Sequence, residues 1–154
     1  MALLLPLSGP DADVGESIAN ATTLALLDTK NSSIRMTTYD TSQGLAAATQ
    51  KAVADGNRLI LGPLRGDDVL GVAALARPAK IPVISYSNDI GVAGQNVFLM
   101  GHLPHQSIDR VVRYARGQGM ARFGAIVPKS VYGQRAGASL GLSVKDAGGT
   151  LISI

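Results

Sequence analysis

The chain has 154 residues, of which 46% are hydrophobic and 16% charged, so it can bury a core and is not expected to be disordered. It contains no Cys, which excludes disulfides, thiol catalysis and Cys-based metal sites. The formal charge of +3 is unevenly spread: residues 1–100 hold seven Lys/Arg and nine Asp/Glu, whereas residues 101–154 hold seven and two. Aromatic residues make up only 4% and no recognised motif is present, so nucleic-acid binding is not predicted.

Strand-like and helix-like patterns alternate from the N-terminus. The apolar run over residues 2–7 predicts a first strand, and it is too short to serve as a signal or membrane segment. Apolar residues at helical spacing then predict a helix over residues 14–29, with Asp13 as its N-cap. The expected buried face of that helix comprises Val14, Ile18, Ala21 and Ala25.

The same alternation continues to the end of the chain. Further strands are predicted over residues 34–39, 58–61, 81–86, 97–100, 123–127 and 151–154. Further helices are predicted over residues 45–54, 67–77, 107–116 and 131–147. The helix over 107–116 is expected to expose Arg110, Arg113 and Arg116 and to bury Ile108, Val111, Val112 and Ala115.

Strands that alternate with helices of about 10–17 residues indicate βαβ units. The predicted fold class is therefore α/β, with a doubly wound and mostly parallel sheet, helices on both faces and right-handed crossovers. One domain boundary is expected in the glycine-rich stretch 117–121, where the balance of charge also changes.

The loops between these elements lack the motifs of common enzyme sites. No G-x-G-x-x-G follows the first strand, and neither a Walker A sequence nor a G-x-S-x-G elbow is present. His102 and His105 have a spacing that could hold a metal, but no carboxylate follows before Asp109, so no metal site is expected. Serines at predicted strand ends leave a Ser–His–Asp triad open by composition, yet nothing in the local sequence activates them. A non-enzymatic binding or interaction protein without a cofactor is predicted.

Four motifs occur in a recognisable order: "ALLLPLSG", "LILGPL", "IPVISYSND" and "FGAIVPKSVYGQRAGASL". Their order and spacing resemble the type I periplasmic binding proteins, the class that includes the leucine/isoleucine/valine-binding receptors. The resemblance implies two α/β lobes joined by crossing strands, with a ligand held in the cleft between them. Residues 1–117 then correspond to the first lobe, 118–121 to a hinge, and 122–154 to the opening βαβ unit of a second lobe whose remainder is missing.

The stretch "MGHLPHQSIDRVVRYARGQGMARFGAIVPKSVYGQRAG" is also similar to the binding-protein-like domain of lipoproteins that activate penicillin-binding proteins. One interpretation is therefore a solute-binding receptor of the ABC-transporter type, which takes an amino acid or related small solute. The alternative is an activator that serves peptidoglycan synthesis through contact with a membrane-associated partner protein. An amidase-regulator-like sensor and an enzyme are further alternatives. The resemblance implies a periplasmic location.

By this resemblance, the loop after Gly62-Pro63 faces the ligand. In the amino-acid receptors, hydroxyls and backbone N–H groups of this loop bind the ligand carboxylate at a helix N-terminus. The matching positions here are Arg65, Gly66, Asp67 and Asp68. Two carboxylates in a first turn complement the helix dipole and repel an anionic ligand, so free leucine is expected to bind weakly or not at all. Asp67 is expected to be the N-cap, while Arg65 either pairs with a carboxylate or lies exposed.

Other candidate ligand-binding residues come from the same resemblance. Ser8 and Gly9 line the first loop or form only a turn. Ser85, Ser87 and Asn88 match the loop after "PVIS" and can donate hydrogen bonds. Tyr132 matches an aromatic residue of the second lobe that covers the ligand in the receptors; the alternative is a packing role at a helix start.

The segment 122–154 is also expected to mediate association. It contains two apolar strands and one amphipathic helix, too little chain to cover both faces of a sheet and pair its edges. A homodimer through residues 122–154 is therefore predicted, either by symmetric pairing or by exchange of this segment.

Overall fold

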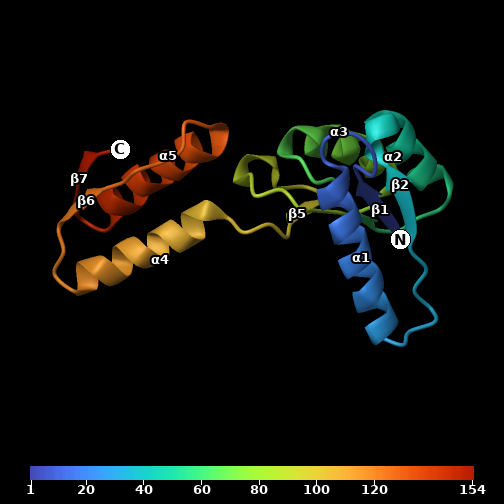
Figure 1. Ribbon diagram of the computed structural model, residues 1–154, viewed down its shortest axis with the longest axis horizontal. Coiled ribbons are helices and arrows are strands. Elements are labelled where there is room, and N and C mark those ends of the chain that lie inside the picture. The colour runs from blue at the N-terminus through green and yellow to red at the C-terminus, as the bar shows by residue number, and fades with distance from the viewer. The chain divides into compact units, whose positions relative to one another are not determined.

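The computed structural model describes residues 1–154, and the chain divides into two compact units, Met1–Gly101 and His102–Ile154 (Figure 1). Both units are built from strands that alternate with helices, as the sequence predicts. No helix combines the length and the apolar composition that a membrane crossing requires.

A five-stranded parallel sheet organises the first unit. Its strands are β1 (Ala2–Leu5), β2 (Thr37–Asp40), β3 (Ile60–Leu61), β4 (Val83–Ser85) and β5 (Val97–Leu99). They lie in the order β2-β1-β3-β4-β5, and every neighbouring pair is parallel, which confirms the predicted α/β class. The strands are shorter than the apolar runs suggested; β3 stops after Leu61 because Gly62 takes a φ of +103° and turns the chain.

Helices cover both faces of this sheet. They are α1 (Ala12–Asp28), α2 (Leu45–Ala54) and α3 (Gly66–Ala76), with short 3-10 turns η1 (Thr41–Gln43), η2 (Arg77–Ala79) and η3 (Ile90–Val92). Ala2 and Leu4 of β1 belong to a buried cluster with residues of α2 and α3. Leu3 and Leu5, which alternate to the opposite face, are also fully buried, and α1 contacts β1 without joining that cluster.

The helix α1 packs differently from the sequence prediction. It begins at Ala12 with Asp11 at the N-cap, and no side chain makes a capping hydrogen bond, so the prediction of Asp13 as N-cap is wrong. The turn starts earlier because the Ala12 N–H already bonds to the Gly9 carbonyl at 3.2 Å. Of the expected buried face, Val14, Ala21 and Ala25 are exposed and Ile18 is half-buried. Only Gly15 is buried, where a Cβ would collide with the Pro6 carbonyl.

The second unit is a smaller βαβ arrangement with a preceding helix. Its elements are α4 (Pro104–Gly117), β6 (Arg122–Gly124), α5 (Val131–Asp146) and β7 (Thr150–Ser153). β6 and β7 pair in parallel, and α4 packs against α5 with Val112 and Val144 buried. The Ser130 hydroxyl caps α5 by accepting from the Gly133 N–H at 3.2 Å.

The division of the chain lies earlier than the expected hinge at 118–121. The two units separate between Gly101 and His102, and α4 belongs with α5 because the apolar side of α4 packs on that helix. Gly119 takes a positive φ of +84°, whereas Gly117 is the last residue of α4. The glycine-rich segment therefore ends a helix inside the second unit.

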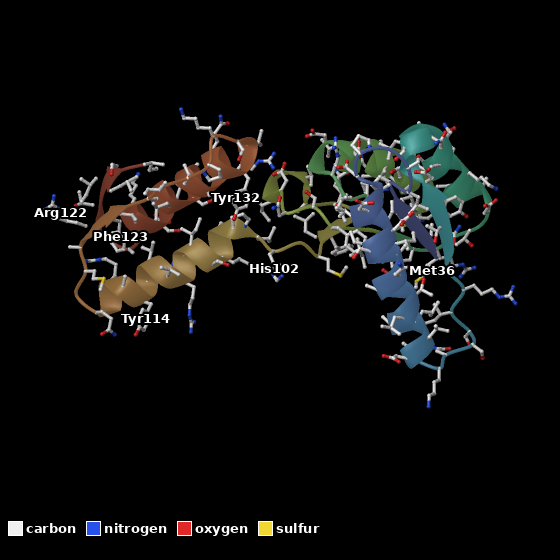
Figure 2. All side chains as sticks on the ribbon, viewed as in Figure 1. Met36, His102, Tyr114, Arg122, Phe123 and Tyr132 are labelled. Atoms are coloured by element: carbon white, nitrogen blue, oxygen red, sulfur yellow. The ribbon has the colours of Figure 1, made fainter.

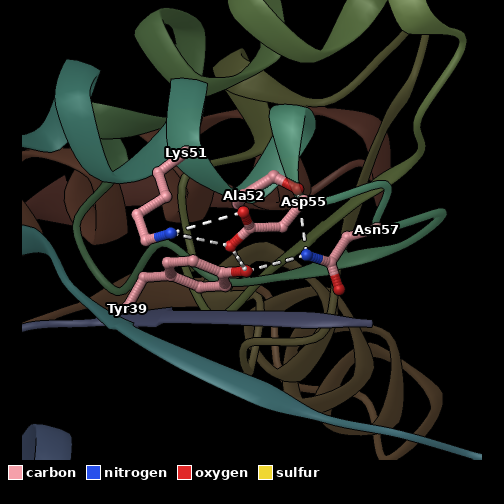
Figure 3. Close-up of polar contacts among 5 residues, drawn as sticks. All are labelled: Tyr39, Lys51, Ala52, Asp55 and Asn57. Atoms are coloured by element: carbon pink, nitrogen blue, oxygen red, sulfur yellow. Dashed lines mark hydrogen bonds and ion pairs between the residues drawn. The ribbon is translucent and has the colours of Figure 1, made fainter.

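A polar cluster fastens β2 to the end of α2 (Figure 3). The Tyr39 hydroxyl donates to Asp55 Oδ2 at 2.8 Å and accepts from Asn57 Nδ2 at 2.9 Å, and Asn57 also donates to the Ala52 carbonyl at 2.9 Å. Lys51 lies 3.1 Å from the same carboxylate. The pKa of Asp55 is lowered mainly by the hydrogen bond from Tyr39 and, to a smaller extent, by the one from Lys51. The pKa of Tyr39 is raised by burial and by its hydrogen bond to Asp55.

Replacement Tyr39→Phe should lower the free energy of unfolding by about 1–2 kcal/mol at neutral pH, because it removes the two hydrogen bonds that the hydroxyl makes with Asp55 and Asn57. The Asp55 pKa is lowered in the folded state, so its contribution is present above the unfolded value of 3.8 and is lost as pH falls below that value. Urea denaturation of both proteins at several pH values should therefore show a gap that narrows in acid. A gap that stays constant down to pH 2, or widens, would contradict this assignment.

Glycine at position 62 is required by both its backbone angle and its surroundings. A Cβ there would collide with the Leu4 carbonyl, whereas Gly56 has a similarly positive φ of +77° with nothing near its Cβ position. We expect Gly56→Ala to cost roughly 1–2 kcal/mol from the backbone angle alone, and Gly62→Ala to cost at least about 3 kcal/mol. Denaturation of the two variants measures the difference, and equal losses would show that the close approach to Leu4 is unimportant.

Candidate functional site

The loops that follow β1 and β3 meet where the strand order reverses. β1 lies between β2 and β3, and in open α/β sheets ligands bind outside the carboxyl ends of the strands at such a point. A pocket of about 230 Å³ opens there. Its lining residues are Pro6, Pro10, Asp11, Thr41, Ser42, Leu64, Arg65 and Asp68.

Ser8, in the loop after β1, is bonded to neighbouring protein groups. Its hydroxyl donates to Asp40 Oδ2 at 2.8 Å and accepts from Gln43 Nε2 at 3.0 Å, while its carbonyl accepts from the Ser42 hydroxyl at 2.7 Å. Asp40 also accepts the Leu7 and Ser42 N–H groups, each at 2.9 Å. These bonds, led by that from Leu7, lower the pKa of Asp40 against the opposing effect of burial. The network ties the β1 and β2 ends together.

Arg65 is paired within the chain. Its Nη2 atom lies 2.6 Å from Oδ2 of Asp11. Asp11 ends the loop after β1 and Arg65 ends the loop after β3, so the ion pair bridges two sides of the pocket. The Arg65 side chain is 63% exposed, and such a pair adds little stability. The ion pair nevertheless gives the Arg65 guanidinium, which lines the pocket, a carboxylate partner within the chain.

The N-terminus of α3 differs from the sequence prediction. Arg65, not Asp67, is the N-cap, and it makes no side-chain capping bond. The prediction for Asp67 is wrong because Gly66 already has helical geometry, which places Asp67 and Asp68 inside the first turn. Burial raises the pKa of Asp68, Arg65 partly opposes this, and the charge of Asp67 adds to it. The pocket therefore has an acidic wall beside a paired arginine.

Ser85 and Ser87, at the end of β4, are buried and support the neighbouring loop. The Ser85 hydroxyl donates to the Pro63 carbonyl at 2.9 Å and accepts the Ser87 N–H at 3.0 Å. The Ser87 hydroxyl accepts the Asp89 N–H at 3.1 Å. A Cβ on Gly66 would lie 3.0 Å from Ser87 Oγ, so the start of α3 packs directly against this serine.

The remaining candidate residues are exposed. Gly9 has a φ of +77° and open space around it, as a turn residue does. Asn88 is exposed in the loop after Ser87. Tyr132 is 51% exposed near the start of α5 and belongs to the second unit, so the first-unit pocket is described without it.

Two acidic residues of this region were not singled out from the sequence. Asp11 and Asp40 hold the strand-end loops together, the first by its ion pair and the second by three of the hydrogen bonds at Ser8 and its neighbours. Asp40 could have been found, since it is the last residue of a strand whose carboxyl end lies at the same edge of the sheet. The pairing of Asp11 with Arg65 depends on the conformations of two loops and leaves no local signal.

The second unit contains a larger but mainly apolar hollow of about 690 Å³. It is lined by Ala125, Ile126, Val127, Pro128, Lys129, Gly133, Gln134, Gly137, Ala138 and Ile154. Lys129 is the single charged group among them, so the smaller pocket of the first unit carries more of the polar chemistry. No cluster of three or more His, Cys, Asp or Glu side chains is arranged to hold a metal ion.

Two curated proteins are similar to this chain. An uncharacterised protein of Rickettsia prowazekii is 34% identical over 136 residues, which are 87% of this chain and 36% of the relative. The penicillin-binding protein activator LpoA of Photobacterium profundum is 25% identical over 148 residues, covering 88% of this chain and 23% of the relative. The chain thus spans about a third or less of the length of these relatives.

Solved structures show the same fold. A substrate-binding protein of an ABC transporter from Sphaerobacter thermophilus matches with a TM-score of 0.80 at 21% identity, over 99% of this chain and 45% of that protein. A family model described as "periplasmic binding protein" matches residues 1–154. That match covers the whole sequence and agrees with the parallel sheet and its strand order, so the chain belongs to the periplasmic binding protein family.

Proposed function

We propose that this chain is part of a periplasmic activator of a penicillin-binding protein, acting through protein contact rather than as an enzyme. The observation that carries the proposal is the Asp11–Arg65 ion pair at the strand-end pocket. In this pair the Arg65 guanidinium is bound to Asp11, and the Asp68 carboxylate also lines the pocket. The free carboxylate of an amino acid therefore finds no unpaired positive group there. The relative named as a penicillin-binding protein activator supports the same function.

The other polar groups at the strand ends agree with this proposal. The hydroxyls of Ser8 and Ser85 donate to Asp40 and to the Pro63 carbonyl. These bonds hold the loops to one another, as a surface of fixed shape requires. A ligand carboxylate that competed for these donors would have to break bonds that already satisfy buried or half-buried groups.

A solute-binding receptor is the second candidate. Thr41 and Ser42 line the pocket together with Asp68, and hydroxyls beside a carboxylate suit a solute rich in hydrogen-bond donors. The pocket is smaller than the range of roughly 300–1,000 Å³ typical of ligand sites, so such a solute would be small or would need a second wall.

Calorimetric titration of the full-length parent protein can separate the two functions. Leucine, isoleucine and valine should give no saturable heat at millimolar concentration, whereas the extracytoplasmic domain of one penicillin-binding protein from the same organism should bind. Micromolar binding of a branched amino acid would overturn the proposal. Binding of a neutral, donor-rich solute without any penicillin-binding protein would favour the receptor.

We also propose self-association of this chain through residues 122–154. Ile126, Ile152 and Ile154 are exposed there, and β6 and β7 pair only with each other. Light scattering over a concentration series should show dimers of the 154-residue chain, and a chain ending at Gly101 should remain monomeric. A monomer at high concentration would refute this association, as would a dimer that persists in the shortened chain.

A further inference from the structure

One face of α4 lies outside the contact that this helix makes with α5. Val112 is buried against α5, but Val111 is 65% and Tyr114 is 70% exposed. Figure 2 shows Tyr114 projecting from the side of α4 that faces away from α5. The prediction that Val111 is buried is therefore wrong, since a residue about 100° round the helix from Val112 lies outside the contact. Val111 and Tyr114 are three residues apart and form neighbouring apolar side chains on the helix surface.

The three arginines of α4 differ in whether another group of the chain already binds their side chains. Arg113 Nε lies 2.7 Å from Asp109 Oδ2, and this contact raises the pKa of Arg113. Arg116 is half-buried and donates to the carbonyls of Ala147 at 3.0 Å and Met120 at 3.1 Å. Arg110 is exposed, and no hydrogen bond or ion pair within the chain engages it. It is adjacent to Val111 and one turn before Tyr114, so a free cation borders the apolar pair.

We infer that Arg110, Val111 and Tyr114, here called the α4 patch, dock a protein partner that presents acidic residues around an apolar recess. Tyrosine and arginine are among the side chains that most often dominate binding at protein interfaces. The charge of the unit supports an acidic partner, because the chain from residue 101 onward holds seven Lys/Arg against two Asp/Glu. The inference rests on the proposed function in taking a penicillin-binding protein as the first partner to test.

A protein fits this surface better than a membrane does. Attachment to a lipid surface needs a broad apolar face and several basic groups, each adding a small increment of affinity. The α4 patch offers two apolar side chains and one uncommitted arginine. A small patch of this kind suits the centre of an interface, where a few side chains carry most of the affinity.

The test uses the full-length parent protein and immobilised extracytoplasmic domains of the penicillin-binding proteins of the same organism. Arg110→Glu and Tyr114→Ala should each weaken binding by roughly 10- to 30-fold, and the effect of Arg110→Glu should shrink as salt is raised. Matched controls are Arg58→Glu and Leu24→Ala, an exposed cation and an exposed apolar residue of the first unit, outside the segment proposed for self-association. They should change affinity less than about twofold, and thermal unfolding should show all four variants folded.

The possible results test the α4 patch and the proposed function separately. Wild-type binding that the α4 patch variants leave unchanged overturns the α4 patch while the proposed function stands. If the wild type binds none of these proteins, the proposed function fails. The α4 patch is then tested with a photo-crosslinking amino acid at position 114 or, as the control, at position 24 in living cells. The α4 patch is supported by an adduct with one identified protein that forms from position 114, does not form from position 24, and is lost with Arg110→Glu. No adduct from 114, or Arg110-dependent binding to phosphatidylglycerol vesicles instead, overturns it.

Discussion

The parallel pairing of β1 between β2 and β3 is the constraint on which the first unit depends. All four residues of β1 are fully buried, so its backbone groups must be satisfied by its two neighbours. Because β2 and β3 pair with opposite edges of β1, the direction in which successive strands are added to the sheet reverses at β1. The loop after β1 is thereby brought against the ends of both β2 and β3. The contacts of Ser8 with Asp40 and of Asp11 with Arg65 both follow from that placement.

The polar groups of the strand-end loops support the proposed contact with a protein over the binding of a solute. In a solute site, a small number of placed polar groups fix the orientation of the ligand. Here the donors at the ends of β1 and β4 are bonded to protein oxygens, and the guanidinium of Arg65 has a carboxylate partner. Loops of this kind are held in one shape by their own contacts. On this ground we propose that the loops recognise another protein rather than the free carboxylate of an amino acid.

Much of the fold could be predicted from the sequence because the period of the apolar residues switches clearly between strand and helix. The order of the elements followed from that switch, and Gly62 supplied a reliable end for β3. Burial on individual faces was less predictable, since α1 and the edge of α4 carry apolar residues that no neighbouring element covers. Val14 and Val111 illustrate this, because helical spacing alone places them beside residues that are more deeply buried.

The chemistry of the candidate site was harder to predict than its position. The loops were identified correctly as strand-end loops, but the roles of Asp67 and Arg65 depend on where α3 begins, which differed from expectation by one residue. Asp11 contributes to the pocket only because two loops distant in sequence approach each other. Such contacts have no periodic signal in the sequence, and the resemblance to amino-acid receptors implies ligand donors in these loops instead.

The most direct test is a two-dimensional ¹H–¹⁵N NMR titration of this chain with leucine, followed at the backbone amides of Arg65, Gly66 and Ser87 and at the Nε–H of Arg65. If the strand-end loops are satisfied by their own contacts, none of these resonances will shift in a saturable way up to millimolar leucine. A saturable shift centred on the start of α3, accompanied by a change at Arg65 Nε–H, would show that the Asp11 pair yields to a ligand carboxylate. It would identify the pocket as a solute site.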